Sequence, residues 1–204
     1  GTAQTTVGYA ITGGITQNTD YRVIVTCTNS SDSDTSTVVS VTLNPANACY
    51  CEPESDCTDS DEMTNVTFAG INNNSTCSGT GYSDFTSSVS AGAVIAGLSY
   101  PISVTIPPHV GTQHVVAWVD YNQNGTFEAS EFTLLGTSPA AGSIVTSNIA
   151  VPVSALAGQT RIRIRTRYNT ALTAADACME YLYGETEDYL IDITAAVACT
   201  GTPD

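Results

Sequence analysis

The chain repeats one pattern along most of its length: a short run of β-branched and aromatic residues, closed by Gly, Asn, Asp or Ser. From residue 64 onward this pattern predicts strands at 64–69, 81–89, 100–106, 114–120, 132–136, 143–151, 160–168 and 188–194. Short helical turns are expected only near 153–157 and 171–176. Strands at this spacing predict an all-β fold, specifically an antiparallel β-sandwich that resembles a jelly roll.

The first 46 residues predict a separate and incomplete β segment. Strands are expected at 7–11, 21–28 and 37–43, and Asn44-Pro45 ends the last of them. Three strands are too few for a sandwich, which usually needs about seven. The acidic, Cys-rich stretch "NACYCEPESDCTDSDEM" (47–63) then reads as a disulfide-closed entrance to the second domain.

The charge of the chain excludes several classes of partner. It has 20 Asp and Glu, five Arg and no Lys, which gives a formal net charge of −15. Nucleic acids and anionic membranes require a cationic surface, so neither is an expected partner. No apolar run approaches the roughly 18–20 residues of a membrane span, and no signal-peptide pattern opens the chain. We therefore expect a mature or excised segment with no membrane insertion.

Seven cysteines without a paired CxxC zinc pattern favour an oxidising, extracytoplasmic compartment. Sequons agree with a secreted or cell-surface location, although they also arise by chance in chains rich in Asn and Thr. Candidate glycosylation sites are Asn29, Asn65, Asn73 and Asn74, and a further sequon begins at Asn124. The pairing cannot be deduced from spacing. Our working hypothesis joins Cys51 to Cys57, Cys77 to Cys178, and Cys27 to Cys199 between repeats.

Residues 120–131 match the pattern D-x-[DN]-x-[DN]-G-x5-E of a calcium loop at every position. The expected calcium ligands are Asp120, Asn122, Asn124, the backbone carbonyl of Thr126, Glu128 and Glu131, and Gly125 permits the sharp turn. The competing interpretation is a polar hairpin turn around Asn-Gly. The flanking "HVVAWVD" reads as a strand, and calcium sensors need helices that reorient. We therefore expect Ca²⁺ to act as a structural clamp.

Four of the five arginines alternate in "TRIRIRTRYN" (160–169), which places Arg161, Arg163, Arg165 and Arg167 on one face of a strand. Such a stripe can grip acidic glycans or a neighbouring protomer. It can instead form a ladder against acidic strands of the same chain, in which each exposed pair contributes about 0–1 kcal/mol. The internal ladder is the favoured interpretation.

A resemblance to a known family rests on several ordered blocks. "YGETEDYLIDI" (183–193) contains a close relative of the signature of the GEVED domain, a β-sandwich module of large secreted and surface proteins of Bacteroidota. "WVDYNQNGTFEASEF" (118–132) is similar to that family's upstream segment. "YCEPESDC" and the Asn-rich stretch near residue 73 also resemble segments of these proteins. Thr186 stands where the family name has Val.

The resemblance covers about 49–194 and implies a GEVED-like, calcium-binding sandwich over 47–194. It also implies that 1–46 is part of an immunoglobulin-like or fibronectin-like repeat. Glu185, Glu187 and Asp188 would form a second acidic cluster near the calcium loop. On residue pattern alone, these acidic residues read as a solvated turn.

The two ends of the chain, "CTGTPD" and "GTAQTT", read together as one continuous domain opening. This favours one period of a repeating array, or a tail (195–204) that completes a neighbour by strand addition; an ordinary chain end is the alternative. His109 and His114 lie in no recognisable catalytic context. We therefore expect a non-enzymatic structural or adhesive module of a surface adhesin or filament, with copies of itself and possible glycans as partners. The competing class is a carbohydrate-binding accessory module of a secreted enzyme.

Overall fold

The computed structural model describes residues 15, 17–43 and 49–196 of the chain, which divides into two compact units, 1–45 and 46–204. The regular structure of these described residues consists of β-strands and two single-turn 3-10 helices, η2 (Ala129–Glu131) and η3 (Ala174–Asp176), which confirms the all-β prediction. No helix among the described residues combines the length and apolar character needed to cross a bilayer.

The first unit contains two short antiparallel pairs. They are β1 (Thr19–Tyr21) with β4 (Val39–Val41), and β2 (Ile24–Thr26) with β3 (Ser33–Thr35). The predicted strands at 21–28 and 37–43 overlap these pairs, whereas the strand predicted at 7–11 lies outside the described residues. Large apolar side chains of this unit are solvent-exposed, including Val23, Ile24, Val25, Val38 and Val39.

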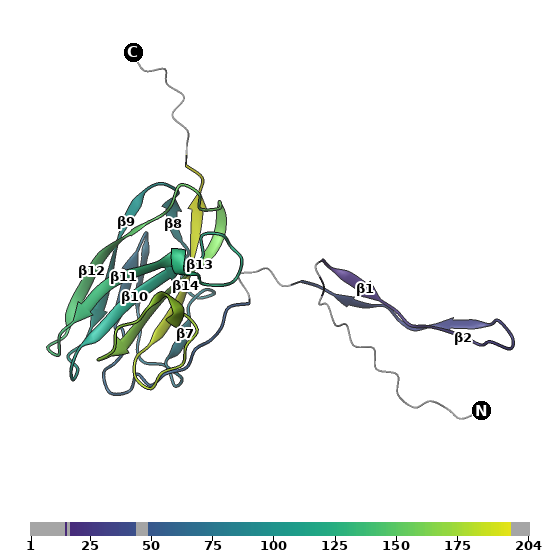
Figure 1. Cartoon of the computed structure of the whole chain (residues 1–204), viewed down its shortest axis with the longest axis horizontal. Helices are drawn as coiled ribbons and strands as arrows, with labels where there is room; N and C mark the ends of the chain where they lie inside the picture. The colour runs from purple at the N-terminus through teal and green to yellow at the C-terminus, as the bar shows by residue number, and fades with distance from the viewer. Residues whose placement is uncertain (1–14, 16, 44–48, 197–204) are drawn as a thin grey trace, which may run out of the picture. The chain divides into compact units, whose positions relative to one another are not determined.

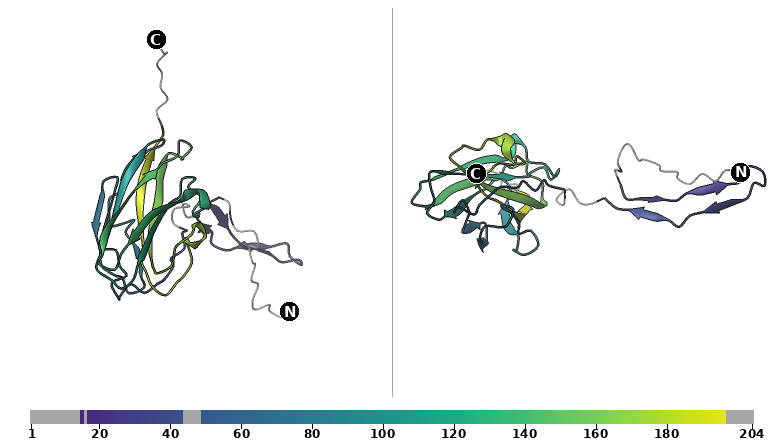
Figure 2. Two further views of the ribbon diagram at one scale, coloured as in Figure 1. Left: turned by 60° about the vertical axis from the view of Figure 1, so that its left-hand side comes forward. Right: turned by 90° about the horizontal axis from the view of Figure 1, so that it is seen from below.

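The second unit is a sandwich of two sheets (Figure 1; Figure 2). The larger sheet has six strands, ordered β11 (Phe132–Ser138), β10 (Gln113–Val119), β13 (Gly158–Tyr168), β14 (Thr186–Thr194) and β7 (Tyr82–Asp84), with β8 (Gly92–Ile95) also paired to β14. The smaller sheet has the order β12 (Ser143–Ala150), β9 (Ser99–Ile106), β5 (Asn65–Phe68) and β6 (Ile71–Asn74). Strands β7 and β8 run parallel to β14, and all other pairs are antiparallel.

The main hydrophobic core lies between these two sheets. Alternate residues of each strand face it, such as Ile162 and Ile164 of β13 and Val104 of β9, all fully buried. This alternation follows from the two-residue period of a β-strand. We call the side of the larger sheet that faces this core its inner face.

The opposite, outer face of the larger sheet is also covered. Trp118 and Val116 of β10 pack there with Leu172 and Ala177, and Phe127 packs against the same small cluster. Strand β13 is consequently buried on both faces along most of its length. The outer face is therefore a second interior, closed by loops from distant parts of the sequence.

Both disulfides differ from the predicted pairing. Cys51 pairs with Cys178 and Cys57 pairs with Cys77, with Cα–Cα distances of 5.7 and 5.4 Å. The segment from Cys51 to Cys57 passes from one loop to another, so its two cysteines bond to different loops instead of to each other. Spacing carries no information about that path.

Two local predictions were wrong. The single strand expected at 81–89 is interrupted after Asp84, whose Oδ1 accepts a hydrogen bond from the Thr86 N–H at 2.8 Å and starts a turn; the chain resumes as β8. Residues 153–157 form a turn without helix, whereas the helical turn expected at 171–176 is present as η3. Strands β6 and β8 were not predicted.

Candidate functional site

The oxygen-rich loop 120–131 connects β10 to β11. Asp120 follows the last residue of β10 and is fully buried. Its Oδ1 accepts the Asn124 N–H at 3.2 Å, and its Oδ2 accepts the Gly125 N–H at 2.9 Å. Gly125 has a φ of 82°, in the left-handed region that favours glycine. The loop therefore folds back around its first carboxylate, as the spacing predicts.

The middle of the loop gathers around Glu128. Asn122 Nδ2 donates to Glu128 Oε2 at 2.6 Å, and Asn124 Nδ2 donates to Glu128 Oε1 at 2.8 Å. The two amide oxygens accept backbone N–H groups of the loop: Asn122 Oδ1 accepts that of Asn124 at 3.1 Å, and Asn124 Oδ1 accepts that of Thr126 at 2.8 Å. An amide oxygen has two lone pairs, so each can keep its N–H bond and bind a cation as well.

The last predicted ligand, Glu131, is buried in η2 with 3% of its surface exposed. Its Oε1 accepts the Tyr121 N–H at 2.8 Å, and its Oε2 accepts the Glu128 N–H at 3.0 Å. Burial raises the pKa of Glu131, and the negative charge of Asp120 raises it further. The loop thus holds two buried carboxylates that repel each other.

The donor set of the loop fits Ca²⁺, which takes six to eight oxygen ligands from carboxylates, amides and backbone carbonyls. Three of the predicted ligands are carboxylates, Asp120, Glu128 and Glu131, and the rest are amides and the carbonyl of Thr126. Within the described part of the chain, no three His, Cys, Asp or Glu side chains form a group placed to hold a metal ion. Binding at this loop would therefore depend on its amide and carbonyl oxygens as well.

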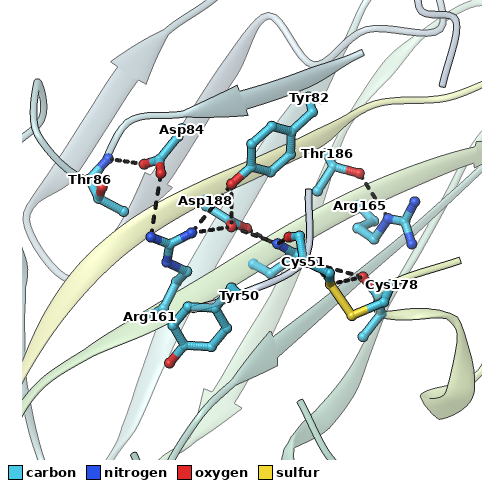
Figure 3. Close-up of polar contacts among 12 residues, drawn as sticks. Tyr50, Cys51, Tyr82, Asp84, Thr86, Arg161, Arg165, Cys178, Thr186 and Asp188 are labelled. Carbon is cyan, nitrogen blue, oxygen red and sulfur yellow. Dashed lines mark hydrogen bonds and ion pairs between the residues drawn. A yellow bond between two sulfur atoms is a disulfide. The ribbon is translucent and has the colours of Figure 1, made fainter. Parts of the chain in front are cut away.

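The outer face of β13 and β14 carries a buried ion-pair network (Figure 3). Arg163 binds Asp188 with both Nε and Nη2, at 2.8 and 2.7 Å, and both side chains are fully buried. Arg161 Nη1 lies 2.9 Å from the same carboxylate, and the Tyr82 hydroxyl donates to it at 3.0 Å. The predicted internal ladder is present at Arg161 and Arg163, and both arginines are buried because loops cover this face.

Residues 49–51, which we call the strap, join this network to the loop. The Arg161 guanidinium lies 4.6 Å from the centre of the Tyr50 ring, and the Tyr50 hydroxyl donates to Asp120 Oδ2 at 2.5 Å. Arg163 Nη2 donates to the Cys51 carbonyl at 2.5 Å, and Cys51 is fixed by its disulfide to Cys178. The strap therefore connects the loop 120–131, the ion pairs and a disulfide.

The next arginine along the strand, Arg165, is held mainly by neutral oxygens. Its Nε donates to the Thr186 hydroxyl at 2.8 Å and its Nη2 to the Met179 carbonyl at 2.8 Å, while its guanidinium lies 4.3 Å from the centre of the Tyr181 ring. Burial lowers the pKa of Arg165 to about 10. The hydroxyl of Thr186, at the position where the GEVED motif has valine, therefore serves as an acceptor for a buried cation.

The inner face of β14 carries Glu185, just before the strand, and Glu187, and both are fully buried. Glu185 Oε2 accepts the Met63 N–H at 2.6 Å, and Glu187 Oε2 accepts the Tyr189 hydroxyl at 2.6 Å. Burial raises the pKa of Glu185 to about 8, with a contribution from the charge of Glu187, and burial raises the pKa of Glu187 to about 7. These carboxylates are costly to ionise where they stand.

The predicted second acidic cluster is therefore divided between two faces. Asp188 lies on the outer face and is linked to Asp120 of the loop through Arg161 and the Tyr50 side chain of the strap. Glu185 and Glu187 lie on the inner face. The preceding Gly184 has a φ of 143°, and a Cβ there would collide with the Thr166 carbonyl. The glycine of the GETEDY motif is thus required by close contact between backbones.

A pocket of about 350 Å³ is lined by Asp59, Asp61, Val110, Tyr168 and Tyr183. The two tyrosine rings are 6.1 Å apart in an edge-to-face arrangement. Gln113 is fully buried and donates from Nε2 to Asp61 Oδ1. This is the place in the described structure where two aromatic rings and two carboxylates line one cavity.

The remaining predicted sites differ in accessibility. Of the candidate glycosylation sites, Asn29 and Asn74 are exposed, whereas Asn65 and Asn73 are half-buried. The Asn65 amide donates a hydrogen bond to Asn74 Oδ1 at 3.0 Å, and the Asn73 amide donates one to the Tyr189 hydroxyl at 3.0 Å. Cys27 is exposed and forms no disulfide with another described cysteine. Cys199, its predicted partner, lies outside the described residues.

Sequence reasoning missed Tyr50, Asp61, Gln113 and Ser75 as parts of these polar networks. The first three act through contacts with residues far away in the sequence, and Ser75 bonds to the Met63 carbonyl at 2.9 Å. No short-range pattern marks such residues. The division of Glu187 from Asp188, in contrast, follows from the two-residue period of a strand and could have been predicted.

Comparison with known proteins agrees with this arrangement. The family model of the GEVED domain matches residues 114–192, which run from β10 through the calcium-type loop to the end of the GETEDY strand. No curated protein matches the chain at a significant level. The similarity to the GEVED domain therefore covers the second part of the sandwich, residues 114–192.

Proposed function

We propose that the chain is a non-enzymatic, extracellular structural or adhesive module that is stabilised by Ca²⁺ and disulfides. It would serve as a repeating unit of a cell-surface adhesin or an extracellular filament. The observation that carries this proposal is the hydrogen bond from Tyr50 to Asp120, because it joins the loop to the strap, the buried arginines and a disulfide. The polar groups of this face are engaged in holding segments together.

In this proposal Ca²⁺ is held by Asp120, Asn122, Asn124, Glu128 and Glu131, with the backbone carbonyl of Thr126. Its positive charge would offset the repulsion between the carboxylates of the loop. The loop would then hold β10 and β11, which it connects, in place. Through Asp120 it would also fix the Tyr50 hydroxyl. The metal would therefore act as a clamp on several segments of the sandwich.

Assembly by strand addition is supported by the exposed first unit. A two-stranded pair is at best marginally stable in water, and its free edges can accept another strand. Both pairs of this unit are of that kind, and their valines and isoleucine are exposed. We propose that the tail 195–204 of another copy adds a strand there. Residues 197–204 lie outside the described structure, so this part rests on the exposed strand pairs of the first unit.

An extracellular location is supported by the two disulfides, which persist in oxidising compartments. The absence of lysine and the net charge of −15 also fit a partner that is reached through Ca²⁺ or backbone pairing instead of cationic contacts. Among the candidate sequons, the exposed Asn29 and Asn74 are the ones whose position favours glycosylation.

The clamp is tested by proteolysis of the full chain with a Glu-specific protease, because two glutamates lie in the loop. We expect cleavage after Glu128 to be roughly tenfold faster in EDTA than in millimolar Ca²⁺, because a loop without its metal opens locally more often. Asp120→Asn in Ca²⁺ should be cut as fast as the wild type in EDTA, and the control Glu52→Gln should behave as the wild type. Equal cleavage of the wild type in both buffers would contradict the clamp.

Assembly is tested by size-exclusion chromatography and negative-stain microscopy of the same protein with and without EDTA. We expect multimers or filaments in Ca²⁺, and a chain ending at residue 196 should remain monomeric. A full-length chain that is monomeric in Ca²⁺ at all concentrations would exclude self-assembly through the tail.

The second candidate, a carbohydrate-binding module, is favoured by the pocket of Tyr168, Tyr183, Asp59 and Asp61. Aromatic faces stack on sugar rings, and carboxylates accept hydrogen bonds from sugar hydroxyls. Glycan binding that is lost in Tyr183→Ala and retained in Asp120→Asn would support this candidate over the clamp alone.

A further inference from the structure

The inner face of β14 carries two carboxylates for which the described structure supplies no cation. Glu185 and Glu187 are two residues apart and therefore point to the same side of the strand. Each has one oxygen, Oε1, that is buried and has no hydrogen-bond partner among the described residues. A buried carboxylate oxygen without a partner is strongly unfavourable, so such atoms call for a ligand that the chain itself does not supply.

The arginines of the domain cannot fill this role. Arg161 and Arg163 form their ion pairs with Asp84 and Asp188 on the outer face, and Arg165 and Arg167 lie near the Tyr181 ring. The chain has no lysine. None of the ion pairs found among the described residues involves either glutamate.

A nearby pocket lined with hydroxyl groups includes Ser75 and Ser78, which contact the same two side chains. The pocket, of about 450 Å³, is lined by Asn74, Ser75, Thr76, Cys77, Ser78, Ser83 and Phe85. Ser83 is the register partner of Glu187 on β7, so their side chains lie on the same side of the sheet. The Ser75 hydroxyl contacts Glu187, and the backbone of Ser78 contacts Glu185, which limits the rise of each pKa.

We propose that Glu185 and Glu187 form a second divalent-cation site, independent of the loop 120–131, and that Ca²⁺ is its ligand. The unpartnered Oε1 atoms supply two carboxylate ligands. The Ser75 hydroxyl, which contacts Glu187, and water supply the rest of the six to eight oxygens that Ca²⁺ requires. The site goes beyond the proposed clamp, because it lies on the inner face and uses no residue of the loop.

Such a site would bind together parts of the sandwich that the loop does not reach. Glu185 accepts the Met63 N–H, and Ser75 is tied to the Met63 carbonyl, next to the Cys57–Cys77 disulfide. A cation there would join the start of β14 to the turn after β6. The alternative state of the pair is two carboxyls kept neutral by protons, and the experiment separates the two.

The test is the number of Ca²⁺ ions bound by the full, oxidised chain, measured by calorimetry and by metal analysis after removal of metal with EDTA. Three variants are compared with the wild type at pH 7.5: the loop variant D120N/E131Q, the pair variant E185Q/E187Q, and the control E52Q/E54Q. Glu52 and Glu54 are exposed, so the control removes the same two charges from the surface. Glutamine keeps the shape of the buried glutamates, and circular dichroism checks that each variant is folded.

We expect about two Ca²⁺ per chain for the wild type and the control, and about one for the loop and pair variants. Retention of all wild-type sites by the pair variant would overturn the inference and leave a pair that is neutralised by protons. Loss of all binding in the loop variant would also overturn it. A third outcome is one Ca²⁺ per chain in the wild type that the loop variant keeps and the pair variant loses. In that case the inference stands and the proposed clamp at the loop fails.

Discussion

Neighbouring acidic residues of β14 are neutralised in different ways on the two faces of the sheet. Asp188, on the outer face, is bound by Arg161, Arg163 and the Tyr82 hydroxyl. Glu185 and Glu187, on the inner face, have hydrogen bonds to one oxygen each and no cationic partner among the described residues. The first group has its counter-ions built into the chain, whereas the second requires protons or an external cation.

This difference has consequences for stability. A buried charge with its partners in place is tolerated, and removal of one partner leaves the other uncompensated. A buried carboxylate without a cation instead destabilises the fold whenever it is ionised. Substitutions that remove charge should therefore have opposite effects on the two faces.

The largest effect is expected from Asp188→Asn, which leaves Arg161 and Arg163 buried without their carboxylate. The free energy of unfolding should fall by about 3–5 kcal/mol. Chemical denaturation with Ca²⁺ present measures the loss. A change of less than about 1 kcal/mol would show that the pair is not buried in solution.

Removal of the Cys51–Cys178 disulfide in C51S/C178S should cost about 2–4 kcal/mol, because this bond closes a long loop in the unfolded chain. The strap should also detach, which exposes the arginines of the outer face. Hydrogen exchange of residues 49–52 reports this detachment. The control is C27S, since Cys27 is exposed, and it should leave both quantities unchanged.

The inner face should give the metal-free protein a characteristic pH dependence. The folded-state pKa values of Glu185 and Glu187, about 8 and about 7, lie above the ordinary value of 4.5, so the folded state holds extra protons between these limits. The contribution of these two carboxyls to the free energy of unfolding is therefore fully present below about pH 4.5, and it is lost as the pH rises toward 8. In EDTA the free energy of unfolding should fall steadily between pH 5 and 8, because the unfolded chain has already released the protons that the folded state still holds. A flat profile that matches E185Q/E187Q would exclude this origin.

The smallest effect is expected from Asp84→Asn. Asp84 lies 3.4 Å from Arg161, but its side chain is 37% exposed, so water screens the pair. The loss should be below about 1 kcal/mol. A loss as large as that of Asp188→Asn would show that the partly exposed and the buried partner of Arg161 contribute alike.

The sequence predicted the sandwich because its strands alternate regularly, and it predicted the sharp turn at Gly125 because that turn is set by local spacing. It also placed the arginines on one face of β13. It did not predict their burial, because the covering residues, such as Tyr50, Phe127 and Ala177, come from distant segments. The disulfide pairs and the strand interruption after Asp84 likewise depend on the path of the chain in space.

The contrast between the two faces is tested most directly by the thermal unfolding midpoint of Glu187→Gln in EDTA at pH 8. Without a cation, the substitution removes a buried negative charge and keeps the hydrogen bond from Tyr189 possible. The account predicts a midpoint above that of the wild type, opposite in sign to the effect of Asp188→Asn. A midpoint lowered as in Asp188→Asn would contradict it, because Glu187 would then have a stabilising counter-ion within the chain.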